Sequence, residues 1–472
     1  MKVTSILFLI LSPLLTDAKT WLVGPGKQYA KPSEVASLVK DGDSVLIDAA
    51  EYKMDVSKWT AHNLKLLGVG GKAHLNAEGT SFGGKAIWVI AGNFNTIENI
   101  EFSNCTVVDR NGAGIRLEGT SLIVRHCYFH NNQNGILAGD NSMSDVLVEY
   151  SEFSRNGAGD GFSHNIYINH LRSFTFQFNY VHHAYYGHEV KSRAYKNSIL
   201  FNRITNEDGD ASYEIDLPNG GECVVMGNSI QQGKYSDNNT FISYGREGLT
   251  NPGPHNFIFV YNTIVNNEDK GIVLNVQSNM DTLFCANNLI AGNITLLSGI
   301  PKFYFNSHNI LNTDISKFNF RLSDPYDYHL TQDSPGKDSA LILKQSFLNI
   351  ALNPGFEYVH PLANKIRIAD AKPDIGCYEF QKTLDAEQGF QNNARVYFLP
   401  KVNQLRFAES EAFQFPLELT LELFNMNGVK CIKSQMRIHQ ATIELPALNP
   451  NLYIYKIQIG NQLISGLFVV TD

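Results

Sequence analysis

The 472-residue sequence predicts an all-β protein, a right-handed parallel β-helix followed by a small C-terminal β-sandwich. Three observations support this prediction: a short motif recurs along the chain, the composition favours strands and turns, and apolar and polar residues alternate near the C-terminus. The sequence contains 29 Phe, 21 Tyr and 37 Gly, which suits short strands joined by tight turns rather than helices.

The recurring motif is Asn-x-Ile or a close relative. Its copies read FNYV, FNRI, GNSI, YNTI and NNLI and lie 23 to 34 residues apart, with the asparagines Asn179, Asn202, Asn228, Asn262 and Asn288. Cys127 and Ser151 stand at the same position in two earlier copies. A unit this short cannot bury its own apolar side, so the units must stack, which favours one β-helix coil per repeat. We expect the asparagines to form a ladder that satisfies the backbone groups of the turns.

The two ends of the chain predict export. Residues 1–18, MKVTSILFLILSPLLTDA, have a lysine, an apolar run and a final small residue, which is typical of a secretory signal peptide. The run is too short for a membrane span, and no later segment resembles one. We expect a β-helix domain over 19–380, a linker over 381–394 and a β-sandwich over 395–472. The predicted location is secreted or attached to the cell surface.

Charge and strand pattern limit the classes of partner. A net charge of −8 argues against a nucleic-acid binder, so an anionic ligand needs a local basic site. The long strand face of a β-helix suits an extended chain, and export suits glycan foraging. We therefore expect a polysaccharide ligand, no nucleic acid, no transmembrane segment and a monomer.

Strand alternation predicts where the candidate site residues point. With Ile272 and Leu274 of GIVLNV inward, the same register directs two columns outward. The first column is Tyr167, Glu189 and Glu214, and the second is Asn169, Lys191 and Asp216. His164 and His188 begin two of these strands, and Arg193 flanks the second column. Five of the 14 histidines lie between positions 164 and 188, so we expect a site rather than a solvated charge ladder.

These residue types fit three kinds of function. For proton abstraction from a uronate, Lys191 or His188 is the candidate base, Arg193 the carboxylate clamp and Tyr167 or a histidine the acid. For hydrolysis, Glu189, Glu214 and Asp216 supply an acid and a base. For binding alone, the tyrosines and histidines of the same face stack on and hydrogen-bond a glycan.

Several segments resemble known β-helix proteins. WLVGPGKQYAKPSEVASLVKDGDSVLIDAAEY resembles the opening of pectate-lyase-like proteins, while DYHLTQDSPGKDSA and PDIGCYEF resemble the closing segment of exported bacterial β-helix proteins. EVKS followed by an Asn-x-Ile corner resembles the lysine-bearing coil of the alginate and chondroitin-B lyase family. That resemblance implies a β-elimination in which Lys191 is the base.

The lyase resemblance also implies an arginine on the next coil and a calcium ion held by acidic residues. Asp216 and Leu217 stand where the arginine is expected, and Ala184 and Tyr186 occupy the stretch of the calcium ligands. We therefore expect no cofactor, with calcium as the ion to test. The most favoured function is a polysaccharide lyase acting on a uronate-containing glycan, with the hydrolase and the glycan-binding protein as alternatives.

The C-terminal segment, residues 395–472, resembles a different protein family. LFNMNG, LNPNLYIYKI and the terminal GLFVV resemble the sorting domain of the type IX secretion system of Bacteroidota, although Asn451 replaces a usual glycine. The resemblance implies that the type IX machinery is a partner. A carbohydrate-binding β-sandwich is the alternative.

Overall fold

The computed structural model describes residues 18–321, 326–369 and 372–380, and then 396–399, 404–407, 417–425, 430–438, 442–446, 448, 451–459 and 462–470. The chain divides into two compact units, Met1–Gln381 and Lys382–Asp472. The predicted linker 381–394 lies outside the described residues, as does all but the last residue of the predicted signal peptide. Among the described residues, no helix has the length and apolar character needed to cross a membrane.

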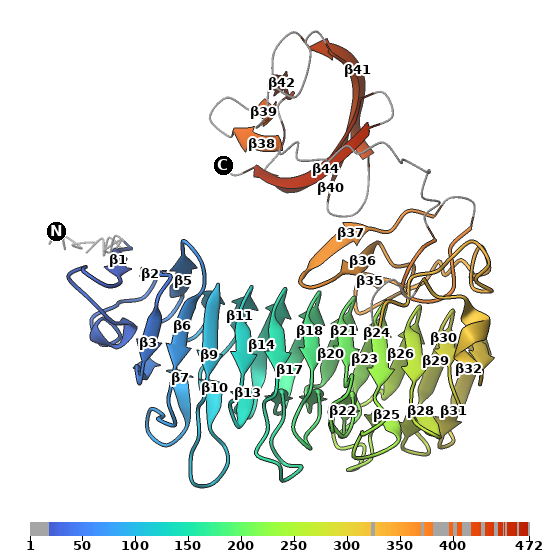
Figure 1. Ribbon diagram of the computed structural model, residues 1–472, viewed down its shortest axis with the longest axis horizontal. Helices are drawn as coiled ribbons and strands as arrows, with labels where there is room; N and C mark the ends of the chain where they lie inside the picture. The colour runs from blue at the N-terminus through green and yellow to red at the C-terminus, as the bar shows by residue number, and fades with distance from the viewer. Residues whose placement is uncertain are drawn as a thin grey trace, which may run out of the picture. The chain divides into compact units, whose positions relative to one another are not determined.

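The first unit is a parallel β-helix with three sheets, which we call A, B and C (Figure 1). Each complete coil contributes one strand to A, then one to B, then one to C; the first coil has a strand in A alone, and the last has strands in A and B. Sheet A has 12 strands in the order β1 (Thr20–Val23), β2 (Ser44–Asp48), β5 (Lys65–Val69), β8 (Asn95–Glu98), β11 (Leu122–Arg125), β14 (Asn141–Glu149), β17 (Leu171–Gln177), β20 (Lys196–Leu200), β23 (Glu222–Met226), β26 (Asn256–Val260), β29 (Thr282–Ala286) and β32 (Phe303–Ser307).

Sheets B and C run beside it with the same coil order. Sheet B has 11 strands, β3 (Glu51–Lys53), β6 (Ala73–Asn76), β9 (Ile100–Ser103), β12 (Tyr128–His130), β15 (Glu152–Ser154), β18 (Tyr180–His182), β21 (Arg203–Thr205), β24 (Ser229–Gln232), β27 (Thr263–Asn266), β30 (Leu289–Ala291) and β33 (Ile310–Asn312). Sheet C has 10 strands, β4 (Ser57–Trp59), β7 (Ala86–Ile90), β10 (Ala113–Leu117), β13 (Asn134–Ala138), β16 (Ile166–Ile168), β19 (Val190–Ser192), β22 (Ile215–Leu217), β25 (Thr240–Tyr244), β28 (Gly271–Val276) and β31 (Ile294–Ser298).

The predicted asparagine ladder is confirmed at the corner between sheets A and B. Each side-chain amide donates to the side-chain oxygen of the next at 2.8 to 3.1 Å. We call this set the A/B ladder; its members are Asn179, Asn202, Asn228, Asn262, Asn288 and, beyond the prediction, Asn309. The residue before each member has a positive φ, as at Phe178 (59°) and Phe201 (54°), so the chain turns sharply between the two sheets. Ser151 caps the ladder, because its N–H donates to Asn179 Oδ1 at 2.9 Å.

A second ladder at the corner between sheets B and C was not predicted. Asn132 donates to Asn156 Oδ1 at 3.1 Å, Asn156 donates to Asn165 Oδ1 at 2.8 Å, and Asn165 Nδ2 donates to Glu189 Oε2. We call Asn132, Asn156, Asn165 and Glu189 the B/C ladder. All four are buried, so this ladder lies inside the coils and ends on a carboxyl group.

Stacked apolar side chains fill the remaining interior. Phe102, Phe129 and Phe153 stand on successive strands of sheet B, with ring centroids 4.9 and 4.8 Å apart. The spacing is that of adjacent strands, so identical side chains repeat along the core. The apolar core runs from Trp21 to Ile290 without interruption between coils.

After the last coil the chain folds back over the A/B corner. This return begins with the 3-10 helix η2 (Ile315–Phe318); another 3-10 helix, η1 (Pro32–Glu34), lies near the start of the chain. The return then forms two antiparallel strand pairs, β34 (Ser346–Phe347) with β35 (Ile350–Ala351), and β36 (Phe356–Val359) with β37 (Ala363–Ile366). Phe318, Leu343 and Cys377 of the return share one apolar cluster with Phe178 and Phe201. The outer side of the A/B corner is therefore covered.

The second unit consists of two antiparallel sheets. One contains β38 (Val396–Leu399), β39 (Gln404–Phe407) and β42 (Thr442–Glu444); the other contains β41 (Lys430–Ile438), β40 (Leu417–Asn425), β43 (Asn451–Ile459) and β44 (Gln462–Val470). Leu405 and Ile443 of the first sheet share an apolar core with Leu421, Leu423 and Ile457 of the second. The predicted fold class, a parallel β-helix followed by a small C-terminal β-sandwich, is confirmed.

Candidate active site

A row of polar side chains crosses the outer face of sheet C. The strand register pairs Tyr167 of β16 with Lys191 of β19, and Lys191 with Asp216 of β22. The neighbours Val190 and Ile215 point into the core. Since parallel strands lie about 4.8 Å apart, the three outward side chains are within reach of one another.

The predicted pairing of Lys191 with Asp216 is confirmed, but the rest of the two columns is wrong in its register. Glu189 and Glu214 are fully buried instead of outward, so neither can bind a substrate on this face. Each precedes its strand at the B/C corner, where two consecutive residues turn inward and the alternation of a flat strand does not hold. Val273, expected outward, is buried inside β28, and Ile272, expected inward, is partly exposed.

Asn169 also leaves the predicted site. Its side-chain oxygen accepts the backbone N–H of His170 at 2.9 Å, beyond the end of β16. Tyr167 takes the place beside Lys191 that Asn169 was expected to hold.

Lys191 and Arg193 meet one carboxylate. Lys191 Nζ lies 3.1 Å from Asp216 Oδ2 and 3.4 Å from Glu247 Oε1, and Arg193 donates to Glu247 Oε2 at 2.7 Å. Glu247 therefore presents one oxygen to each cation. Although partial burial opposes it, the hydrogen bond from Arg193 and the charge of Lys191 hold the pKa of Glu247 below its usual value.

The guanidinium of Arg193 is fixed by further contacts. Its Nε donates to the Tyr167 hydroxyl at 2.9 Å, and another nitrogen donates to Asn219 Oδ1 at 2.6 Å. Lys191 and Arg193 also lie near the Tyr167 ring, at 5.9 and 5.8 Å from its centroid. The arrangement holds a planar cation in one orientation and aims the Tyr167 hydroxyl at it.

Two histidines line the strand starts, as predicted. The rings of His164 and His188 stack 4.5 Å apart, and His164 Nδ1 accepts the backbone N–H of His188 at 3.0 Å. His188 Nε2 lies 3.5 Å from Asp216 Oδ2. Burial lowers the pKa of His188 to about 4 and that of His164 well below its ordinary value, so both rings are neutral at neutral pH.

Two carboxyl groups lie directly behind this row. Glu189 accepts the backbone N–H of Ala184 at 3.0 Å, and Glu214 Oε2 accepts from Gln232 Nε2 at 3.1 Å. Burial raises the pKa of Glu189 to about 8 and the pKa of Glu214 well above its ordinary value. Perturbed groups of this kind concentrate at functional sites, although structural networks produce them too.

Sequence reasoning missed Glu247, the residue that joins the two cations. It belongs to the long segment after β25 that contains REGLTNPGPHN, the longest insertion between ladder asparagines. The signal that could have indicated Glu247 is this long insertion, which follows the strand next to β22, the strand that contains Asp216. The same segment places Asn251 Nδ2 against the Arg193 carbonyl at 3.3 Å, which anchors it over the site.

The oxygen donors of this site do not fit calcium. Calcium takes six to eight oxygen ligands, several of them carboxylates free to bind it. Here Asp216 contacts Lys191 and Glu247 contacts both Lys191 and Arg193. An added cation would have to displace these ammonium and guanidinium groups.

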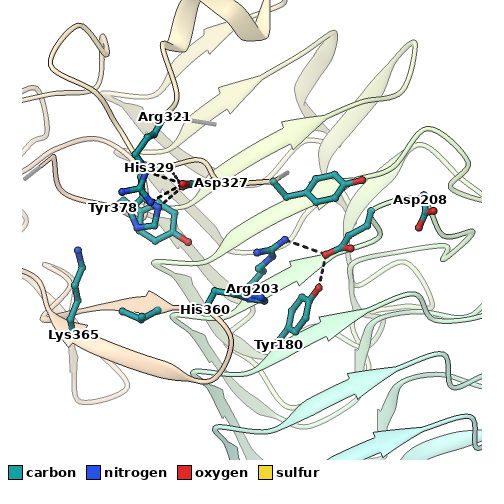
Figure 2. A pocket seen from close by; sticks show the side chains of 12 residues that line it. Tyr180, Arg203, Asp208, Arg321, Asp327, His329, His360, Lys365 and Tyr378 are labelled. Carbon is teal, nitrogen blue, oxygen red and sulfur yellow. Dashed lines mark hydrogen bonds and ion pairs between the residues drawn. The ribbon is translucent and has the colours of Figure 1, made fainter. Parts of the chain in front are cut away.

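A separate pocket lies on sheet B and was missed by the sequence reasoning (Figure 2). Its volume is about 890 Å³, and its walls come from sheet B and from the return after the last coil. Tyr180 donates to Glu207 at 2.5 Å, and Arg203 contacts the same carboxylate at 3.2 Å. Two segments far apart in the sequence build this pocket, so no local motif could indicate it. Its other lining residues are Asp208, Arg321, Tyr326, Asp327, His329, Val359, His360, Lys365 and Tyr378.

Comparison with known proteins supports the fold. A family model described as a right handed beta helix region matches residues 56–165. Among solved structures, the pectate lyase Pel9A superimposes with a TM-score of 0.52 at 12% sequence identity, over 77% of this chain and 96% of that chain. A mutant of the PL6 family alginate lyase AlyGC gives a TM-score of 0.29 at 14% identity, over 68% of this chain and 58% of that chain. No curated protein sequence matches.

At 12% identity the Pel9A match shows the fold alone, and the AlyGC match is too weak to support an argument. The first unit is therefore a right-handed parallel β-helix of the kind found in Pel9A. The chemistry has to be argued from the residues on sheet C.

Proposed function

We propose that the protein is a polysaccharide lyase that cleaves a uronate-containing glycan by β-elimination at the Lys191–Arg193 cluster. The observation that supports the proposal is that Lys191 and Arg193 each contact one oxygen of the same carboxylate, that of Glu247. A uronate presents the same chemical group.

Glu247 is suited to being displaced. Its side chain is 49% exposed, whereas those of Lys191 and Arg193 are 11% and 16% exposed. A substrate carboxylate would take the same two contacts, and Arg193 would remain oriented by Tyr167 and Asn219. Charge-assisted contacts of this geometry are among the stronger hydrogen bonds in proteins.

The reaction needs a base, a neutralised carboxylate and an acid. In our assignment Arg193 keeps the uronate carboxylate neutralised, while Lys191 first passes its own proton to solvent and then takes the proton from the carbon α to that carboxylate. The electron pair of that C–H bond forms a carbon–carbon double bond, the neighbouring bond to the glycosidic oxygen breaks, and the Tyr167 hydroxyl gives that oxygen a proton. His188, neutral beside Asp216, is the alternative base.

Two assays on uronate polymers distinguish the reaction classes. A lyase produces both ultraviolet absorbance from an unsaturated sugar and new reducing ends, a hydrolase produces reducing ends alone, and a binding protein produces neither. Lys191→Ala should lower the lyase rate by at least about 100-fold, as expected for loss of a general base. The matched control is Lys196→Ala, because the Lys196 side chain is 43% exposed on sheet A and lies 3.8 Å from Glu222.

A further variant tests the displacement of Glu247. Glu247→Gln removes the competing negative charge, so KM for a uronate polymer should fall while kcat changes little. A rise in KM would mean that Glu247 helps to hold the substrate, and full activity of Lys191→Ala would transfer the role of base to another group. In that case a pH–rate profile retained down to pH 5 would indicate His188, whose pKa is about 4.

Glu189 and Glu214 cannot serve as the acid and base of a hydrolase, because both carboxyl groups are buried in the core and cannot reach a substrate. Reducing ends without absorbance would instead require Asp216 and Glu247, the two carboxylates that do face the cluster.

For the cell biology, we propose export through an N-terminal signal peptide and the type IX machinery, with the second unit as the sorting domain. The support is the resemblance of its sequence and the fact that Lys382–Asp472 forms a compact unit with its own core. In a Bacteroidota host, removal of residues 382–472 should abolish surface exposure while leaving a folded β-helix in the periplasm. Unchanged surface display of the shortened protein would contradict the sorting role.

A further inference from the structure

Three metal-ligating side chains meet on the outer face of sheet B, away from the site on sheet C. His74 lies on β6, Glu101 on β9 and His130 on β12, which are successive strands of the sheet. Their register pairs His74 with Glu101, and His130 with Ser103 two residues further along the strand. The ligand atoms of all three lie within 4.8 Å of one another.

The distances between these atoms suit a tetrahedral ion. Glu101 Oε1 lies 3.0 Å from His130 Nε2 and 3.5 Å from His74 Nε2. Zinc binds imidazole nitrogen and carboxylate oxygen at about 2.0–2.1 Å, so two ligands of a tetrahedral site stand roughly 3.3 Å apart. The carboxylate therefore already stands at the spacing of zinc ligands from each imidazole, and the two imidazole nitrogens lie within 4.8 Å of each other.

The surroundings fix the donors and leave them accessible. The side chains of His74, Glu101 and His130 are 25%, 24% and 16% exposed, so an ion can enter and a water can complete its coordination. The Tyr128 ring stacks on His130 at 4.4 Å, and Ser103 Oγ contacts His74 Nε2 at 2.8 Å.

We propose that His74, Glu101 and His130 form a binding site for a divalent transition-metal ion, with zinc as the expected ion. Two imidazoles and one carboxylate favour zinc over calcium or magnesium, which prefer oxygen ligands alone. The ion would bridge three successive coils of sheet B. Because the unfolded chain lacks the preformed site, bound zinc would stabilise the β-helix.

The test uses full-length protein without a histidine tag, freed of metal by a chelator. Zinc titration followed by calorimetry should give one equivalent bound, and the melting temperature should rise with zinc concentration. Cobalt(II) should give the intense visible absorbance of a tetrahedral site. Calcium at the same concentrations should produce neither effect.

Three variants locate the site. Glu101→Gln and His130→Ala should each weaken zinc binding at least 10-fold and remove the cobalt spectrum. His170→Ala is the matched control, because the His170 side chain is 42% exposed on another part of the coil, where its Nδ1 lies 3.5 Å from Asp140 Oδ2. Glu101→Gln keeps the shape of the side chain, so its result holds even if His130→Ala folds poorly.

Several outcomes would overturn the proposal. They are the absence of stoichiometric zinc binding, zinc binding that survives both variants, and an octahedral cobalt spectrum. Lyase activity is not part of this test, so failure of the metal site and failure of the proposed function are separate results.

Discussion

The two interior ladders of the β-helix begin alike and end differently. The A/B ladder repeats one residue type, and each asparagine also donates to a backbone carbonyl, as Asn228 does to Ile199 at 2.9 Å. The B/C ladder starts with Asn132 and Asn156, but Asn165 passes its hydrogen bond to Glu189, and Glu214 follows on the next coil. One ladder is neutral throughout, and the other ends in acids.

The position of the change is informative. Glu189 and Glu214 stand immediately before Val190 and Ile215, and the next residues outward are Lys191 and Asp216. In the B/C ladder, carboxyl groups therefore replace amides on the two coils that contain Lys191 and Asp216. A buried carboxyl group is costly where an amide would serve, and departures from local rules are expected at functional sites.

The first prediction breaks the A/B ladder at one residue. Asn228→Ala removes an acceptor used by the backbone and side chain of Asn202 and leaves Ile199 O without its donor. Several buried polar groups then lack partners, so the free energy of unfolding should fall by about 3 kcal/mol. Urea denaturation measures this loss.

The control for this variant is Asn293→Ala. Asn293 is exposed, and its side chain donates to the Asp269 carbonyl at 2.5 Å. Its substitution should change stability by no more than about 0.5 kcal/mol. Equal losses for the two variants would show that the ladder adds nothing beyond a surface asparagine.

The A/B ladder could be predicted because its signal is local. An aromatic residue, a glycine or an asparagine followed by Asn returns once per coil, and the coil length is read directly from positions such as 179 and 202. The fold class follows from that repeat. The same repeat did not predict that the side chains of Glu189 and Glu214 point inward. The residue at the corner turns into the core, and an error of one position in the strand start assigns a side chain to the opposite face of the sheet.

Other parts of the sites depend on contacts between distant segments. Glu247 reaches Lys191 from 56 positions away, and the sheet B pocket needs the return after the last coil. His74, Glu101 and His130 meet only because the coils between them have compatible lengths. These contacts cannot be predicted from a sequence pattern when the strand register is unknown.

The second prediction tests the acidic end of the B/C ladder. Glu189 ionises near pH 4.5 in the unfolded chain, whereas burial raises its pKa in the folded chain to about 8. Between these values the unfolded state loses the proton first. The contribution of Glu189 to the free energy of unfolding should therefore fall as pH rises from 4.5 to 8, by roughly 1 kcal/mol per pH unit, and then level off.

Glu189→Gln removes this titration. The stability of the wild type minus that of the variant should decline between pH 5 and pH 8, measured by urea denaturation at each pH. A constant offset from altered hydrogen bonds to Asn165 or Ala184 does not affect the slope. Glu51→Gln, on the exposed Glu51 of β3, is the control and should give a flat difference. A flat difference for Glu189→Gln as well would show that the buried carboxyl is not held neutral.

The smallest expected effect extends the A/B ladder by one rung. Ser151 already stands at the ladder position, where its hydroxyl accepts from Cys127 N at 3.1 Å and donates to Glu149 O at 3.0 Å. An asparagine there would keep the bond to Cys127 and add a donor for Asn179 Oδ1 and for the carbonyl of the preceding coil, as its neighbours do. Ser151→Asn should therefore stabilise the protein by about 1 kcal/mol in urea denaturation. Ser151→Ala, which loses the acceptor for Cys127 N, should destabilise it by a similar amount. If both variants destabilise, the coil at Ser151 has no room for the larger amide, and the ladder ends at Asn179 for reasons of packing rather than of hydrogen bonding.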